Sequence, residues 1–101
     1  MTERISRPVI SKLIRDCLEV VNSEREDGAR IPLADDTPLL ADDSRLDSLE
    51  LVAFLTDLET RASKIVGRRL SLAADALTAD SEPFRDVGRL TDYLATKLND
   101  A

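Results

Sequence analysis

Residues 46–51 read Leu-Asp-Ser-Leu-Glu-Leu and open the most apolar stretch of the chain. Asp47 is a residue type favoured at a helix N-cap, and Glu50 lies where its side chain can accept a hydrogen bond from the cap amide in a capping box. A helix is therefore predicted to begin at Ser48. Its hydroxyl is free of capping, and the first-turn amides and the helix dipole favour a phosphate on its oxygen. Ser48 is thus a candidate site for covalent attachment through a phosphodiester.

Helical spacing of apolar residues predicts two long helices in the first two thirds of the chain. The first covers residues 9–21, with Ser6 as a candidate N-cap and Pro8 near its first turn. The second runs from Ser48 to about Val66 and is predicted to end at Gly67, because glycine is common at helix C-termini.

A long loop is predicted between these helices, over residues 29–46. Pro32 and Pro38 bias the residues before them away from helical geometry, so this stretch is expected to be extended or turning. The apolar residues expected to anchor it onto the core are Leu33, Leu39 and Leu40.

The C-terminal third contains a short ambiguous segment and a final helix. Residues 70–77 are rich in alanine but too short to assign, and residues 80–83 indicate a break before a helical turn at Phe84. The final helix begins at Val87 or Gly88 and ends at Leu98. No segment reads as a strand, so we expect an all-α protein. Its architecture would be a four-helix bundle with a long first loop and a short third helix, in a single domain over residues 1–101.

The composition excludes several classes of function. The net charge of -6, with one Tyr, two Phe and no Trp, is unsuited to phosphate backbones and to stacking of bases, so no nucleic-acid partner is expected. The absence of histidine removes the commonest general base and most zinc and haem sites. The longest apolar run, Leu51–Leu55, is too short to span a membrane.

Cys17 is the only cysteine, which excludes an internal disulfide and favours a reducing compartment. It falls on the apolar stripe of the first helix and is expected to be a buried small hydrophobe. We therefore expect a cytoplasmic protein, and a monomer.

Four groups of residues occur in an order that extends over most of the chain. They are Asp36-Thr37-Pro38-Leu39 in the loop, Leu46 to Val52 at the second helix, Leu58-Glu59 two turns later, and Phe84-Arg85-Asp86-Val87 followed by Leu90 and Tyr93-Leu94. In this order and spacing the chain resembles the acyl carrier and peptidyl carrier protein family, whose members bind phosphopantetheine.

The resemblance implies a four-helix bundle of the acyl-carrier type that is not itself an enzyme. A phosphopantetheinyl transferase would move 4'-phosphopantetheine from coenzyme A onto Ser48, and the thiol of this cofactor would carry an acyl or aminoacyl group as a thioester. The other implied partners are a loading ligase and an acyltransferase or synthase of fatty acid, polyketide or peptide biosynthesis. The nature of the cargo stays open. The residues expected to contact partners are Asp47, Leu49, Glu50 and Val52.

Three departures from the family indicate a specialised, free-standing carrier. Arg45 occupies the place where a glycine often precedes the aspartate, which puts a positive charge beside the phosphate. The segment between Glu59 and Phe84 is longer than in compact carriers. It also includes basic residues where many relatives are acidic or neutral, and these lie between Arg61 and Arg69.

Several of these residues have alternative interpretations. Ser48 can be an ordinary helix-start serine, and Glu50 can serve the capping box alone. Leu49 and Val52 form an exposed docking patch or pack under the loop. The carboxylates between residues 35 and 43 lack the glycine and final glutamate of a calcium loop, so a solvated acidic loop is expected.

The basic residues between Arg61 and Arg69 can bind an acidic partner or a nucleotide, but cations near a helix C-terminus are favourable without any ligand. A different class of function for the whole chain is a helical adaptor that binds proteins and carries no cofactor. An enzyme that works through carboxylates is a more distant alternative.

Overall fold

The computed structural model describes residues 5–41, 43–78 and 82–99. These ranges are all-α, with an isolated antiparallel bridge between Pro38 and Asp86 and no strand. The elements are α1 (Arg7–Asn22), the 3-10 turn η1 (Asp27–Ala29), α2 (Ser48–Val66), α3 (Leu72–Thr78), the 3-10 turn η2 (Glu82–Phe84) and α4 (Val87–Asn99).

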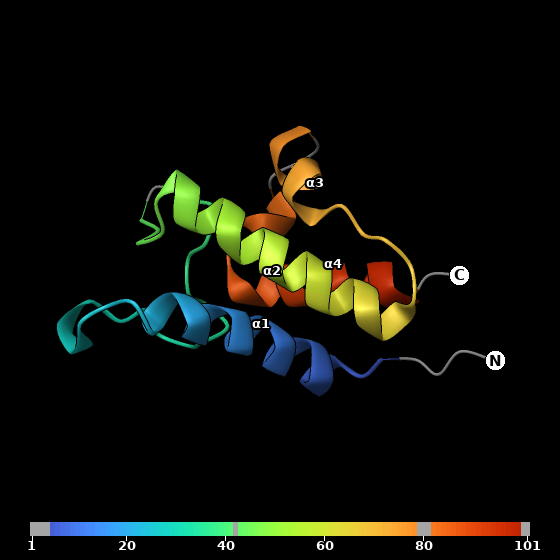
Figure 1. The fold of residues 1–101 in the computed structure, drawn as a ribbon, viewed down its shortest axis with the longest axis horizontal. Helices are drawn as coiled ribbons and strands as arrows, with labels where there is room; N and C mark the ends of the chain where they lie inside the picture. The colour runs from blue at the N-terminus through green and yellow to red at the C-terminus, as the bar shows by residue number, and fades with distance from the viewer. Residues whose placement is uncertain (1–4, 42, 79–81, 100–101) are drawn as a thin grey trace.

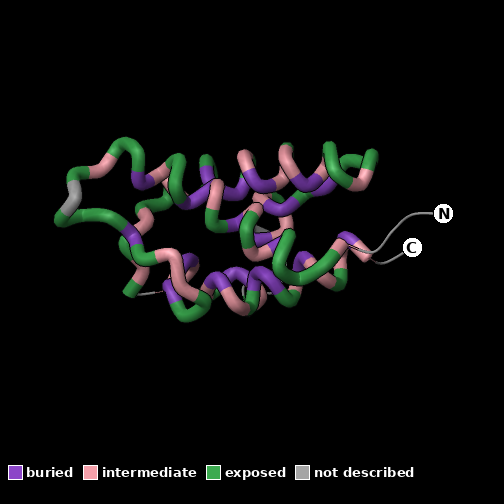
Figure 2. The backbone as a smooth tube through the Cα atoms, turned by 90° about the horizontal axis from the view of Figure 1, so that it is seen from below, coloured by how far each residue is buried: buried purple, intermediate pink, exposed green. Residues whose placement is uncertain are grey.

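The three longer helices pack lengthwise, and the short α3 lies to one side (Figure 1). Helix α1 packs against both α2 and α4, whereas α3 packs against α2 on the side away from α1 (Figure 1). Buried positions recur along one side of the long helices (Figure 2), as the apolar spacing of the sequence predicts. No helix in the described part of the chain has the length and apolar character needed to cross a membrane.

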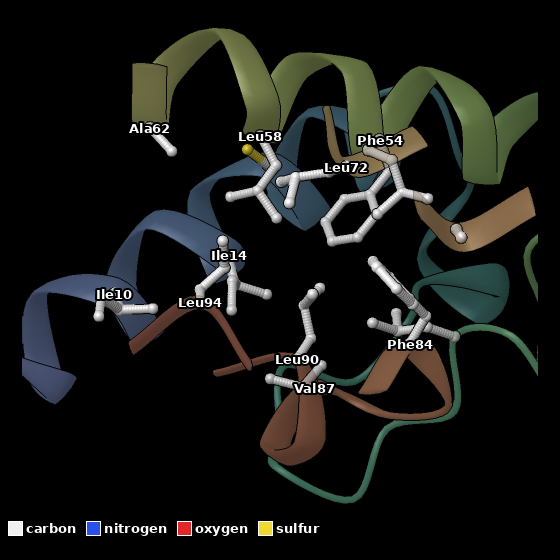
Figure 3. Close-up of a cluster of buried hydrophobic side chains, with 14 of the residues drawn as sticks. Ile10, Ile14, Phe54, Leu58, Ala62, Leu72, Phe84, Val87, Leu90 and Leu94 are labelled. Carbon is white, nitrogen blue, oxygen red and sulfur yellow. The ribbon is translucent and has the colours of Figure 1, made fainter. Parts of the chain in front are cut away.

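The core is formed by aliphatic and aromatic side chains from every helix and from the loop. Phe54 of α2 and Phe84 of η2 point into the same interior, beside Leu58, Leu90 and Leu94 (Figure 3). The largest fully buried side chains are Phe54, Phe84, Ile10, Ile14, Leu18, Leu39, Leu55, Leu58, Leu72, Leu90, Leu94 and Val87.

The helix boundaries agree closely with the sequence prediction. Helix α1 begins at Arg7, two residues earlier than predicted, because the backbone of Ser6 already has the extended N-cap conformation. The Ser6 side chain makes no capping hydrogen bond within the described chain, so its predicted role is confirmed for the backbone only. Helix α2 has the predicted bounds, and Gly67 ends it with φ 70° and donates its amide to the Ser63 carbonyl.

The predicted loop is confirmed between α1 and α2, and it is anchored at two places. Near its start, the amide side chain of Asn22 makes two hydrogen bonds with the backbone of Ile31, of 2.9 and 2.7 Å. Further on, the loop follows the start of α4, where the Gly88 amide donates to the Asp35 carbonyl at 2.7 Å. A Cβ at residue 88 would lie 3.2 Å from that carbonyl oxygen, so glycine permits the close approach. All three predicted apolar anchors contact the core: Leu39 is buried, and Leu33 and Leu40 are partly buried.

The ambiguous segment forms α3, whose start is fixed by α2. The Leu72 amide donates to Glu59 Oε1 at 2.7 Å, and the Leu70 amide donates to Ser63 Oγ at 3.1 Å. Leu70 and Leu72 are both buried. The predicted turn at Phe84 is confirmed as η2. Of the predicted break at residues 80–83, residues 80 and 81 lie outside the described residues, and Glu82 and Pro83 belong to η2.

Candidate functional site

The start of α2 has the predicted capping box. The Glu50 amide donates to Asp47 Oδ1 at 2.7 Å, and the Asp47 amide donates to Glu50 Oε1 at 3.2 Å. The backbone of Asp47 is extended, with φ −78° and ψ 174°, as an N-cap residue requires. Ser48 is thereby released from capping and becomes the first residue of a helix of 19 residues.

Ser48 is exposed at this helix start. Within the described ranges its hydroxyl has no hydrogen-bond partner, and neither its amide nor the amide of Leu49 has an acceptor. These amides lie at the positive end of the helix dipole, so an anion on the Ser48 oxygen would be stabilised by them. The residues present therefore fit a phosphodiester on Ser48.

Leu49 and Val52 are exposed beside the serine, with 80% and 41% of their surfaces accessible. The alternative that they pack under the loop is therefore wrong. An exposed leucine beside the Ser48 hydroxyl is a suitable apolar contact for a protein that approaches this residue.

The outward face of α2 continues from Leu49 without a carboxylate. The exposed residues at helical spacing along this face are Leu49, Ala53, Thr56, Thr60 and Lys64. The side chains in the middle of this face are small and uncharged, so the backbone of another protein can approach α2 closely there. This face was not recognised in the sequence, although its spacing of three and four residues is visible there.

Glu50, predicted to contact partners, also has an intramolecular partner. Both of its carboxylate oxygens accept from Nη2 of Arg25, at 2.7 and 2.8 Å. The exposed fractions of the Arg25 and Glu50 side chains are 16% and 32%. The capping box and this ion pair give Glu50 a structural role, and contact with a partner stays a prediction. Arg25 itself was missed, because nothing local in the sequence indicates a contact across 25 residues.

Arg45 is exposed in the loop before Ser48. Its Nη1 donates to the carbonyl of Arg30 at 3.4 Å, and its own carbonyl accepts from Arg25 at 2.9 Å. The guanidinium borders a hollow of about 370 Å³ together with Asp36 and Asp43. Its predicted place beside a phosphate on Ser48 stays a prediction, because the described residues show no contact between the two side chains.

The acidic loop is solvated, as expected. Asp35, Asp36 and Asp43 are exposed, and Asp42 lies outside the described residues. Over the part of the chain that the structure describes, no three residues of the types that bind metals gather into a possible site.

The basic residues lie at the other end of α2, about 25 Å from Ser48 along the helix axis. Arg61 forms an ion pair with Asp57 at 3.0 Å. Lys64, Arg68 and Arg69 line an open hollow of about 480 Å³. Arg68 also donates to the Lys97 carbonyl at 2.6 Å, which ties this end of α2 to α4.

Cys17 is buried on the core side of α1, as predicted. Burial, and secondarily the nearby Asp57 carboxylate, raise the pKa of the thiol to about 12. A thiol with this pKa is protonated at neutral pH and is a poor nucleophile. Cys17 is therefore a packing residue, not a second site for covalent attachment.

A polar cluster joins α3 to α4. Asp75 accepts hydrogen bonds from Lys97 and, at 2.8 Å, from the Tyr93 hydroxyl. These hydrogen bonds, that of Lys97 first, lower the pKa of the Asp75 carboxyl below its usual value. Lys97 also lies over the Tyr93 ring, 5.3 Å from its centre. This cluster was not predicted from the sequence, because its members come from two helices.

Comparisons with protein-family models, with curated proteins and with solved structures gave no match to this chain in any of the three cases. The interpretation of the site therefore depends on its own geometry and on the motifs of the sequence.

Proposed function

We propose that this protein is an acyl carrier protein that accepts 4'-phosphopantetheine on Ser48. The observation that carries the proposal is the division of roles at the start of α2. Asp47 caps the helix, and the neighbouring Ser48 is left exposed with its hydroxyl unpaired among the described residues. An ordinary helix-start serine would itself be expected to act as the cap.

In the attachment step, Ser48 Oγ forms a bond to the phosphorus that bears the pantetheine group in coenzyme A. The bond from that phosphorus to the adenosine bisphosphate leaving group breaks, and the serine proton passes to a base of the transferase. The amides of Ser48 and Leu49 then face the phosphodiester. When attached, the group supplies a thiol that holds an acyl or aminoacyl cargo as a thioester.

The fold supports the same proposal. Its three long helices, its long loop between α1 and α2 and its short α3 fit a bundle of the acyl-carrier type. Exposed Leu49 and Val52 give the transferase, the loading ligase and the acyltransferase or synthase an apolar contact beside the serine. Asp47 adds a charge at the same place. We further propose that the carrier is not itself an enzyme, and that it works in the cytoplasm as a monomer.

Intact mass spectrometry tests the attachment. The unmodified protein is incubated with coenzyme A and several phosphopantetheinyl transferases of broad specificity, beside the Ser48→Ala and Ser44→Ala variants. We expect one phosphopantetheine group on the wild type and on Ser44→Ala, and none on Ser48→Ala. Addition to Ser48→Ala would show that the site is wrong.

The adaptor alternative is supported by the same exposed Leu49 and Val52, because an apolar patch suits any protein contact. It requires no chemistry at Ser48. Absence of modification by every transferase, with the protein folded by circular dichroism, would favour the adaptor over the carrier.

A further inference from the structure

One guanidinium group joins three segments of the chain. Arg25 lies just after α1, and its Nη1 donates to the Ala29 carbonyl at 3.1 Å. Its Nη2 donates to the Arg45 carbonyl at 2.9 Å and to both carboxylate oxygens of Glu50. Arg25 therefore connects the end of α1, the end of the loop and the first turn of α2.

The Arg25–Glu50 pair is among the less exposed ion pairs of the described chain. Its side chains are 16% and 32% exposed, close to the 28% and 29% of the Lys97–Asp75 pair and well below the 52% and 68% of the Arg7–Asp92 pair. Solvent therefore screens the Arg25–Glu50 attraction less. The Nε atom of Arg25 is buried and has no partner among the described residues, which is a cost to the folded state. The fold keeps Arg25 in place despite this cost.

Within the described residues, the last part of the loop, residues 43–46, has few other hydrogen bonds to the rest of the protein. The amides of Ser44 and Leu46 make only local hydrogen bonds. Hydrogen bonds from these described residues to more distant ones involve Arg45, whose carbonyl accepts from Arg25 and whose side chain donates to the Arg30 carbonyl at 3.4 Å. The preceding residues 35–40, by contrast, are held by four backbone hydrogen bonds to residues 84–88, at the end of η2 and the start of α4.

The Arg25–Glu50 ion pair also supports the N-terminal cap of α2. Glu50 Oε1 accepts from the Asp47 amide while Arg25 holds the carboxylate. Without Arg25, Glu50 would be free to adopt other rotamers, and the reciprocal half of the capping box would weaken. Ser48 lies between the two capping residues, so the backbone that places its hydroxyl would become less ordered.

We propose that Arg25 is a positioning residue for Ser48. It fixes the chain where the loop joins α2, so that the hydroxyl meets a transferase in one orientation. This inference rests on the proposed carrier function. The planar fork of arginine is needed, because a lysine ammonium cannot reach the Ala29 and Arg45 carbonyls and the Glu50 carboxylate in the same geometry.

The test compares the Arg25→Ala and Arg25→Lys variants with Arg61→Ala as the matched control. Arg61 also forms an ion pair involving α2, but its partner Asp57 lies on the same helix and far from the loop. The rate of phosphopantetheine transfer is measured over a range of carrier concentrations. We expect kcat/KM to fall roughly tenfold in Arg25→Ala, to stay low in Arg25→Lys, and to change less than about twofold in Arg61→Ala.

Amide hydrogen exchange separates positioning from general destabilisation. Exchange at residues 44–51 should become faster in Arg25→Ala, while the amides in the middle of α1 and α4 keep their wild-type protection. Glu50→Gln retains an acceptor for the Asp47 amide and removes the charge facing Arg25. Its combination with Arg25→Ala should therefore give no faster exchange at residues 44–51 than Arg25→Ala alone.

Each outcome has a defined meaning. Normal transfer to Arg25→Ala, with Ser48 modified in the wild type, would overturn the positioning role and leave the carrier function intact. Faster exchange throughout the protein would also overturn it, because the variant would be generally unstable. Absence of transfer to both wild type and Arg61→Ala would overturn the carrier function and, with it, any role of Arg25 in that reaction.

Discussion

The two ends of α2 are both well capped, yet they differ in what they leave exposed. At the N-terminal end, Asp47 and Glu50 satisfy the backbone, and Ser48 and Leu49 remain accessible. At the C-terminal end, the left-handed Gly67 closes the helix and the side chains that follow are basic. There, hydrogen bonds from residues 68–72 to α4 and back to α2 hold the next segment in place. The helix start is suited to presenting a group to another molecule, and the helix end is suited to organising the fold.

Leu49→Asp tests the difference between the two ends of α2 and should give the largest loss of phosphopantetheine transfer. A charge in place of an exposed apolar side chain beside Ser48 should lower kcat/KM for phosphopantetheine transfer about thirtyfold, through loss of an interface contact of about 2 kcal/mol. Thr60→Asp, on the same face of α2 but nearer its other end, is the control and should transfer at nearly the wild-type rate. Equal losses in the two variants would mean that the whole face is recognised equally. The free energy of unfolding should change by less than about 0.5 kcal/mol in both.

Gly67→Ala should have the next largest effect, on stability alone. Its φ of 70° lies in the left-handed region, so a Cβ there should cost about 1–2 kcal/mol in urea denaturation. Gly28→Ala is the control, because Gly28 does not have a positive φ and a Cβ would meet nothing within 4 Å. Transfer to Ser48 should be normal in both variants. Slower transfer to Gly67→Ala would contradict the separation of roles between the two helix ends.

Asp47→Ala should destabilise the protein by about 1 kcal/mol, because the Glu50 amide loses its side-chain acceptor. Asp47→Asn retains an acceptor oxygen and should lower the free energy of unfolding by only a few tenths of a kcal/mol. Thermal unfolding followed by circular dichroism measures both. If the two variants were equally unstable, the charge of Asp47, rather than its hydrogen bond, would be the stabilising feature.

The smallest change in stability is expected from acid at the Asp75 cluster, which joins α3 to α4. The pKa of Asp75 is lower in the folded protein than in the unfolded chain, so its contribution is present at neutral pH and is lost as the pH falls through the lowered pKa of the folded state. Asp75→Asn should therefore cost about 0.5 kcal/mol at pH 7 and nothing at the lowest pH at which the protein stays folded. A difference that persisted unchanged across this pH range would exclude the ionised carboxylate as the cause.

The features that the sequence predicts best are those set by neighbouring residues. The capping box needs only Asp47 and Glu50, and the end of α2 needs only Gly67. Both could therefore be predicted from residues that are neighbours in the sequence. Helix α1 begins at Arg7, directly after the candidate N-cap Ser6 and two residues before the apolar spacing starts at Val9, because its first two residues are exposed and lie outside that spacing. Helix α3 was uncertain since its start depends on Glu59, far away in the sequence.

The least predictable features join distant segments. The Arg25–Glu50 contact and the Asp75–Tyr93 hydrogen bond depend on how the helices pack, and no short-range pattern marks either pair. The candidate attachment residue could therefore be predicted, whereas the residue proposed to position it could not.

The division of roles between Asp47 and Ser48 has a thermodynamic consequence. Because the Ser48 hydroxyl makes no hydrogen bond with the described residues, its conversion to a phosphodiester breaks none of the contacts that hold α2. The loaded and unloaded proteins should thus differ in folding free energy only by the effect of an anion at the helix start, about 0.3–1 kcal/mol. The folded body would then be nearly the same in both forms, and a partner enzyme would have to distinguish them by the flexible arm itself.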